Sequence, residues 1–137
     1  MVDVPVVLFV FNRPDHLARV LEQLRRNKIA KLYVFCDGSR GPEDDDGVAA
    51  TRKIINEIDW VEKEVFEASK NKGLSPSIIE GLGMLFKKHE RLIVIEDDIV
   101  IAPGFYNYML KSLEYYKDEK NIYGVTGTCY PIGDKVL

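Results

Sequence analysis

The sequence predicts an α/β domain with a mainly parallel central sheet. Short apolar runs alternate along the chain with segments whose apolar residues recur at helical spacing, the pattern of repeated strand and helix units. The run Arg91–Ile95 is rich in β-branched residues, as is typical of a strand buried on both faces within a parallel sheet. A strand, helix, strand order also implies a right-handed crossover and a parallel pair. We therefore expect residues 1–137 to form a single domain of this class.

Three strands and two helices are expected in the first half of the chain. The apolar run Val4–Phe11 predicts the first strand, and Pro14 then stands in the first turn of an amphipathic helix. Lys31–Cys36 predicts the second strand. The acidic run at 43–46 leads into a second helix, where the acids favour the positive helix end or lie in solvent. Trp60–Phe66 predicts a third strand, and its mixed charges indicate an edge position.

The second half of the chain begins with a polar loop and a third helix. Ser75 is the expected N-cap and Pro76 the first helical residue. Gly81 and Gly83 are costly inside a helix, so we expect close packing at both positions. The expected buried face of this helix consists of Ile78, Ile79, Leu82, Leu85 and Phe86.

Two further elements are expected after the strand Arg91–Ile95. Pro103–Lys117 predicts a fourth helix, and Ile122–Thr126 predicts a last short strand. The residues of the fourth helix that we expect to face inward are Phe105, Met109, Leu110 and Leu113.

Composition excludes several classes of protein. Hydrophobic residues make up 46% of the chain and charged residues 30%, as in a folded globular domain. The net charge of -3 provides no basic surface for nucleic acid. Neither a membrane-spanning run nor a signal peptide is recognisable, so a cytoplasmic location is expected. Cys36 and Cys129 are expected to be buried free thiols, and His16 and His89 to be surface or capping residues.

Polar side chains follow three of the predicted strands at the points where they end. Asn12 and Arg13 follow the first strand, Asp37 the second, and the acids Glu96–Asp98 the fourth. Parallel strands place their carboxyl ends at one edge of the sheet, where ligands of open α/β sheets bind. Carboxylates suit Mg²⁺ or Mn²⁺, while an arginine suits phosphate. The pattern indicates a metal-dependent nucleotide site, although such acids can also be solvated loop residues or helix caps.

Other α/β enzymes fit the sequence less well. Phosphoacceptor receiver domains and haloacid-dehalogenase-type phosphatases need an acidic residue directly after the first strand, where this chain has Asn12 and Arg13. The chain also contains no Gly-x-x-x-x-Gly-Lys-Ser/Thr loop and no Gly-x-Gly-x-x-Gly after the first strand.

Four segments resemble the GT-A-fold glycosyltransferases, most closely the N-acetylglucosaminyltransferase I family and its bacterial relatives. These segments are Phe11–Pro14, Phe35–Gly38, Val94–Ile99 and Ala102–Tyr106. The resemblance implies the Rossmann-like three-layer sandwich of that fold, a UDP-sugar donor, and Mn²⁺ or Mg²⁺ as cofactor. It also implies that Asp98 is the metal ligand, and that sugar transfer proceeds with inversion.

The resemblance also assigns residues to the donor. Asp37 would contact the uracil, Arg13 the nucleotide or diphosphate, and a loop at Lys72 and Gly73 would close over the nucleotide. The full set of expected donor-binding residues is Asn12, Arg13, Asp37, Lys72, Gly73, Glu96 and Asp97.

In the similar enzymes the general base and most acceptor contacts lie beyond the part that this chain matches. We therefore expect a donor-binding domain without the C-terminal acceptor half, as in a fragment of a longer glycosyltransferase, with Asp134 as the only candidate base. The acceptor, whether glycan, protein or lipid, stays open, and exposed apolar surface could favour a homo-oligomer. The alternatives are a nucleotide-sugar-binding module without turnover and a nucleotidyltransferase that makes sugar nucleotides.

Overall fold

The fold is built on one fully parallel four-stranded sheet, seen in a computed structural model that describes residues 3–128. Its strands are β1 (Val6–Val10), β2 (Lys31–Cys36), β3 (Glu62–Glu67) and β4 (Ile93–Glu96). Their order is β3-β2-β1-β4, and every pairing is parallel. The predicted α/β class is confirmed, and β3 occupies the edge that its mixed charges indicated.

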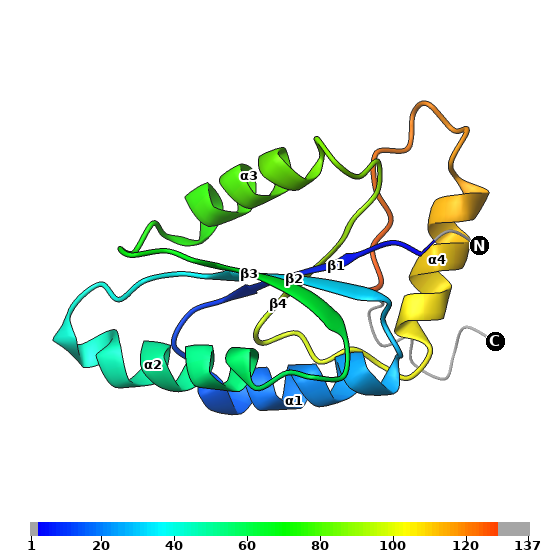
Figure 1. Cartoon of the computed structure of the whole chain (residues 1–137). Coiled ribbons are helices and arrows are strands. Elements are labelled where there is room, and N and C mark those ends of the chain that lie inside the picture. Colours follow the sequence, from blue (N-terminus) through cyan, green and yellow to red (C-terminus); the bar gives the residue numbers. More distant parts are fainter. Residues whose placement is uncertain (1–2, 129–137) are drawn as a thin grey trace, which may run out of the picture.

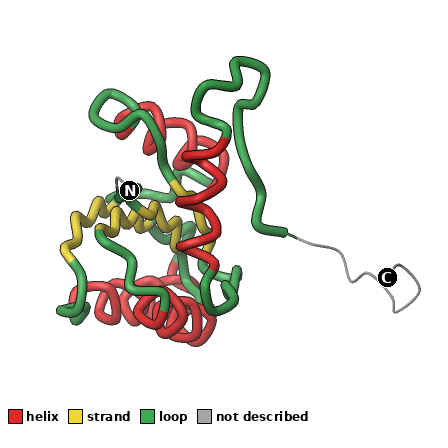
Figure 2. Tube along the Cα trace, turned by 90° about the vertical axis from the view of Figure 1, so that its right-hand side faces the viewer, coloured by secondary structure: helices red, strands yellow, loops and turns green. Residues whose placement is uncertain are grey.

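Four helices surround the sheet in the order expected from the sequence. They are α1 (Pro14–Arg26), α2 (Pro42–Asn56), α3 (Leu74–Leu85) and α4 (Phe105–Tyr115). Helices α1 and α2 cover one face and α3 lies over the other, which gives three layers (Figures 1 and 2). Helix α4 stands at the end of the sheet near the N-terminus, where the Tyr106 hydroxyl donates to the carbonyl of Val4 at 3.0 Å.

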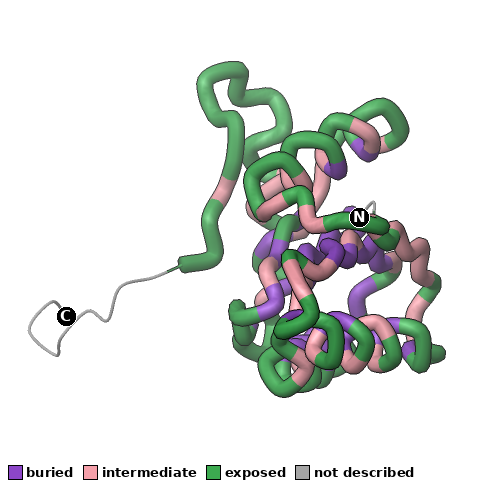
Figure 3. Tube along the Cα trace, turned by 90° about the vertical axis from the view of Figure 1, so that its left-hand side faces the viewer, coloured by how far each residue is buried: buried purple, intermediate pink, exposed green. Residues whose placement is uncertain are grey.

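The core lies on both faces of the sheet, and buried residues concentrate along the strands (Figure 3). Because side chains alternate along a strand, β1 supplies both faces. The larger cluster, under α1, includes Val6, Leu8, Val10, Leu17, Val20, Leu24, Leu32, Val34 and Ile95. The smaller cluster, under α3, is built from Val7, Phe9, Tyr33 and Leu85.

Within residues 3–128, no helix combines the length and the apolar character needed to cross a bilayer.

The predicted buried face of α3 is wrong in part. Ile79 is 72% exposed and Phe86 is also exposed, whereas Gly81 and Leu85 are buried. A Cβ atom at position 81 would lie 3.0 Å from the ring of Phe35, so this glycine allows α3 to approach the sheet closely. Gly83 has no atom within 4 Å of its Cβ position, so the expected close packing there is also wrong.

The strand β4 differs most from its prediction. Val94 is 42% exposed, because the apolar cluster under α3 contains residues of β1, β2 and β3 and none of β4. The expected burial of this strand on both faces is therefore wrong. The segment Ile122–Thr126 forms no strand in the structure, and Gly124 within it weakens strand propensity.

Three element boundaries also differ from their predictions. The acidic run begins inside α2, since that helix starts at Pro42. Helix α3 starts at Leu74, one residue before the expected N-cap Ser75. Helix α4 starts only at Phe105. Cys129 and Asp134 lie outside the described residues.

Candidate functional site

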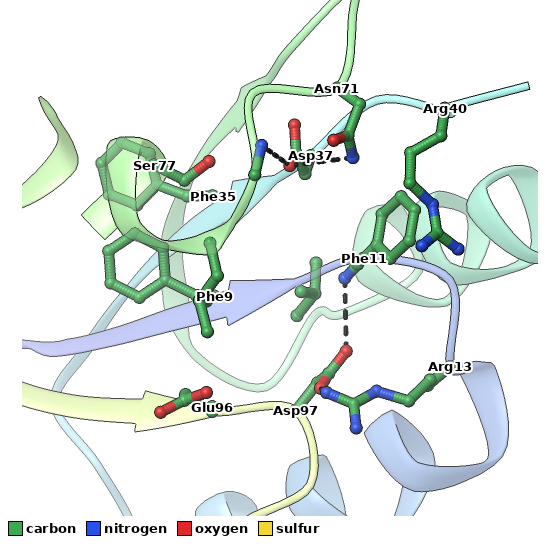
Figure 4. Close-up of a pocket in the computed structure, with 13 residues that line it drawn as sticks. Phe9, Phe11, Arg13, Phe35, Asp37, Arg40, Asn71, Ser77, Glu96 and Asp97 are labelled. Atoms are coloured by element: carbon green, nitrogen blue, oxygen red, sulfur yellow. Dashed lines mark hydrogen bonds and ion pairs between the residues drawn. The ribbon is translucent and has the colours of Figure 1, made fainter. Parts of the chain in front are cut away.

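A pocket of about 240 Å³ lies at the carboxyl ends of β1, β2 and β4 (Figure 4). Five of the residues that the sequence assigned to a ligand line it, namely Arg13, Asp37, Gly73, Glu96 and Asp97. The expected convergence of three strand ends on one edge is therefore observed for these residues. Loops rather than strands supply most of these polar groups, and the strand ends only bring the loops together.

Asp97 and Arg13 join the ends of β4 and β1. Asp97 is only 2% exposed, and its Oδ2 accepts a hydrogen bond from the backbone N–H of Phe11 at 3.2 Å. Arg13 donates through Nη2 to Asp97 and through Nη1 to Asp98, at 2.9 Å in the second case. Partial burial opposes the charge of Arg13, but the two carboxylates outweigh it and raise the pKa of the guanidinium. Arg13 is thus already held by acids in this structure.

Glu96 and Asp98 differ from Asp97 because they have carboxylate oxygens that are free to bind a ligand or a cation. Glu96 lines the pocket, and its side-chain carboxylate makes no hydrogen bond or ion pair to residues 3–128. Asp98 lies outside the pocket lining, with its side chain 41% exposed and only Oδ2 paired, to Arg13. Carboxylate oxygens of this kind suit a hard divalent cation.

No three His, Cys, Asp or Glu side chains in the described part of the chain group as a metal site would. A site that draws on one carboxylate, a ligand diphosphate and water needs no such group. The open oxygen of Asp98 fits that arrangement, and its metal role stays a prediction.

Asp37 is buried at the wall of the pocket and organises the loop before α3. Its Oδ1 accepts from the backbone N–H groups of Gly38 and Lys72, both at 2.8 Å. Its Oδ2 accepts from the backbone N–H of Gly73 at 2.9 Å and from Nδ2 of Asn71 at 3.1 Å. Gly73 adopts a positive φ of 83°, which favours glycine at this turn. The carboxylate therefore fixes the loop that forms one side of the pocket.

Two of the expected donor-binding side chains point elsewhere. The Asn12 amide donates to Oδ1 of Asp44, and the Lys72 ammonium pairs with Glu80. Neither residue lines the pocket at the strand ends. Lys72 contributes through its backbone N–H to Asp37, so the loop it belongs to is part of the site although its side chain is not.

Arg40 is a pocket residue that the sequence did not reveal. Its guanidinium donates to Asp44 through Nε at 2.7 Å and through Nη2 at 3.0 Å, and it lies 5.1 Å from the centre of the Phe11 ring. The hydrogen bond from Arg40 lowers the pKa of Asp44 to about 2. The i, i+4 spacing of this pair was the only signal in the sequence. This signal was missed because Asp44 belongs to the acidic run at 43–46, which was interpreted as solvent-exposed or as favouring the helix end.

Aromatic rings provide the apolar part of the pocket. The ring of Phe9 stacks on that of Phe35 at 5.2 Å between centres, and Phe35 stacks on Phe66 at 4.7 Å. Figure 4 shows Phe9 and Phe35 on one side of the pocket and Phe11 on the other. Asn71 and Ser77, two further lining residues, were also missed.

The arrangement suits a ligand with a planar apolar ring and an anionic part. Few convergent polar groups on an aromatic surface are typical of small-molecule sites. Comparisons with models of known protein families and with curated protein sequences find no match. The likeness to GT-A glycosyltransferases thus rests on the residues quoted above.

Proposed function

We propose that this domain binds the UDP-sugar donor of a metal-dependent glycosyltransferase of GT-A type. The proposal rests on one observation: Arg13, Asp37 and Glu96, which lie at the carboxyl ends of β1, β2 and β4, line the same pocket. In a parallel sheet this edge is where ligands bind. The proposed reaction transfers the sugar with inversion to an acceptor hydroxyl.

The size of the pocket favours the nucleoside as its occupant. Its volume of about 240 Å³ is smaller than the roughly 300–1,000 Å³ of pockets that enclose a whole drug-sized ligand. The base would stack on Phe11, which Arg40 supports from the other side. Stacking of a base on an aromatic side chain contributes about 1–3 kcal/mol. The diphosphate and sugar would then lie at the open rim.

Charge at the rim supports this orientation. Arg13 and Arg40 provide donors for phosphate oxygens, and Asp98 offers the carboxylate for the cation. A bound Mn²⁺ or Mg²⁺ would stabilise the negative charge that develops on the departing diphosphate. Glu96, open on the pocket side, is placed to accept hydrogen bonds from sugar hydroxyls.

Calorimetric titration of UDP and UDP-sugars, with and without Mn²⁺, tests the proposal. We expect binding that depends on Mn²⁺, that is lost in Asp98→Ala, and that persists in Asp59→Ala, which removes an exposed acid outside the pocket. Failure of the folded protein to bind any UDP compound would refute the donor site. Binding without hydrolysis or transfer would favour a non-catalytic module. Release of pyrophosphate from a nucleoside triphosphate and a sugar phosphate would favour nucleotidyl transfer.

A further inference from the structure

We propose that the side-chain carbonyl of Asn71 reads the ring N–H of the base, and that Asp37 is a positioning residue for it. This assignment rests on the proposed function, because it concerns the base of the same nucleotide. The resemblance to GT-A glycosyltransferases gives base recognition to Asp37 and no role to Asn71, whereas this proposal gives it to the Asn71 amide.

The hydrogen bonds of Asp37 argue against direct base recognition by this carboxylate. A carboxylate offers about four acceptor positions, and Asp37 already accepts from Gly38, Asn71, Lys72 and Gly73. Three of these donors are backbone N–H groups in the buried or partly buried loop. A base could bind Asp37 only by displacing one of them, and an unpaired N–H group costs about 1–3 kcal/mol.

The same contacts fix the orientation of the Asn71 amide. Its Nδ2 donates to Oδ2 of Asp37 at 3.1 Å and to the carbonyl of Gly38 at 2.9 Å, which uses both amide hydrogens. Asn71 also lines the pocket. Its Oδ1 has no hydrogen-bond donor among residues 3–128 and is therefore the polar atom that Asn71 can offer to a ligand.

The loop that carries Asn71 is held rigidly before any ligand binds. A Cβ atom at Gly38 would lie 2.6 Å from the carbonyl carbon of Lys70, so the loop packs directly on the backbone after β2. Arg52 of α2 donates through Nη2 to the carbonyl of Ala68 at 2.6 Å from outside the pocket. A preorganised acceptor binds without paying the entropy of ordering the loop.

Uracil matches this acceptor because its ring N3 carries a hydrogen. Methylation of N3 removes that hydrogen and leaves the ring, ribose and diphosphate unchanged. The wild-type protein should therefore bind UDP at least about tenfold more tightly than N3-methyl-UDP, since the methylated base leaves the acceptor unpaired. Asn71→Ala removes the acceptor and makes room for the methyl group, so the two ligands should then bind with about equal affinity.

The experiment is calorimetric titration of both ligands into the wild type, Asn71→Ala and Arg52→Met. Arg52→Met is the matched control. It removes the hydrogen bonds from Nη2 to the carbonyls of Ala68 and, at 3.3 Å, of Asp37, so it loosens the same loop while every side chain that lines the pocket stays in place. It should weaken both ligands equally and keep the preference for UDP. A preference that survives Asn71→Ala would overturn the assignment while leaving the proposed function intact. Loss of preference in Arg52→Met would also overturn it, since loop order alone would then explain selectivity. Absence of UDP binding by the wild type would overturn both proposals.

Discussion

Replacing Asp97 by alanine should distinguish the acids that stabilise the fold from those that are free to bind a ligand. Asp97 is almost fully buried and accepts from the backbone N–H of Phe11 and from Arg13. Its removal leaves the Phe11 N–H without its acceptor at the end of β1. Arg13 keeps its second partner, Asp98.

The expected cost follows from these two contacts. A hydrogen bond to a charged acceptor contributes about 1.5–3 kcal/mol, and the contact between Asp97 and the backbone N–H of Phe11 is partly buried. The ion pair with Arg13 contributes only about 0–1 kcal/mol, because the Arg13 side chain is 43% exposed and solvent screens it. Asp97→Ala should therefore lower the free energy of unfolding by about 1.5–4 kcal/mol. In urea the midpoint should fall by about 1–2 M.

Urea unfolding followed by circular dichroism measures this cost, with Asp98→Ala as the matched control. Asp98 also pairs with Arg13, but both side chains are more than a third exposed, so its loss should cost about 0–1 kcal/mol. Equal midpoints for the two variants would refute the argument that burial and the Phe11 contact distinguish these neighbouring acids.

Three further predictions concern packing, pH and thiol chemistry. Gly81→Ala should destabilise the protein by about 1–3 kcal/mol, because the added methyl group would meet an aromatic ring of β2. Gly83→Ala should stabilise it by up to about 1 kcal/mol. Chemical denaturation measures the free energy of unfolding of both variants. The lowered pKa of Asp44, about 2, means that its stabilisation is complete above the pKa of the unfolded chain and is lost as the pH falls; Asp44→Asn should therefore flatten the stability curve between about pH 4 and pH 2. Burial raises the pKa of Cys36 to about 12, so in a variant whose other cysteine is replaced by serine, a thiol reagent at pH 8 should react only after urea unfolds the protein.

The order of the elements could be predicted because hydrophobic periodicity records local structure. The strand and helix sequence, the parallel pairing and the edge position of β3 all follow from such patterns. Which face of an element is covered depends on its neighbours, so it was predicted less well. Helix α3 is apolar on most sides, and the contact of Gly81 with Phe35 decides which side faces the sheet. The open side of Val94 likewise depends on where α3 lies.

The sequence predicted the location of the site better than it predicted the contacts that its residues make. Strand ends located Arg13, Asp37 and Glu96 correctly at one edge, because parallel topology dictates it. Asn71 lies in a loop whose course depends on tertiary hydrogen bonds, and no pattern in the sequence marks it. Arg40 was marked only by its i, i+4 spacing to Asp44. The resemblance could assign roles only to the residues that matched a motif.

The acids of the site differ in what already binds them, and this difference bears on their function. Asp37 and Asp97 are buried and accept backbone N–H groups, so each stabilises the geometry of a chain segment next to the pocket. Glu96 and Asp98 retain oxygen atoms without such partners. A ligand or cation can engage the second pair without disrupting the fold, whereas engaging the first pair would cost existing hydrogen bonds. Substitutions of Glu96 and Asp98 should therefore change ligand affinity at nearly constant stability. Substitutions of Asp37 and Asp97 should change both, so a loss of binding in those variants does not by itself identify a ligand contact.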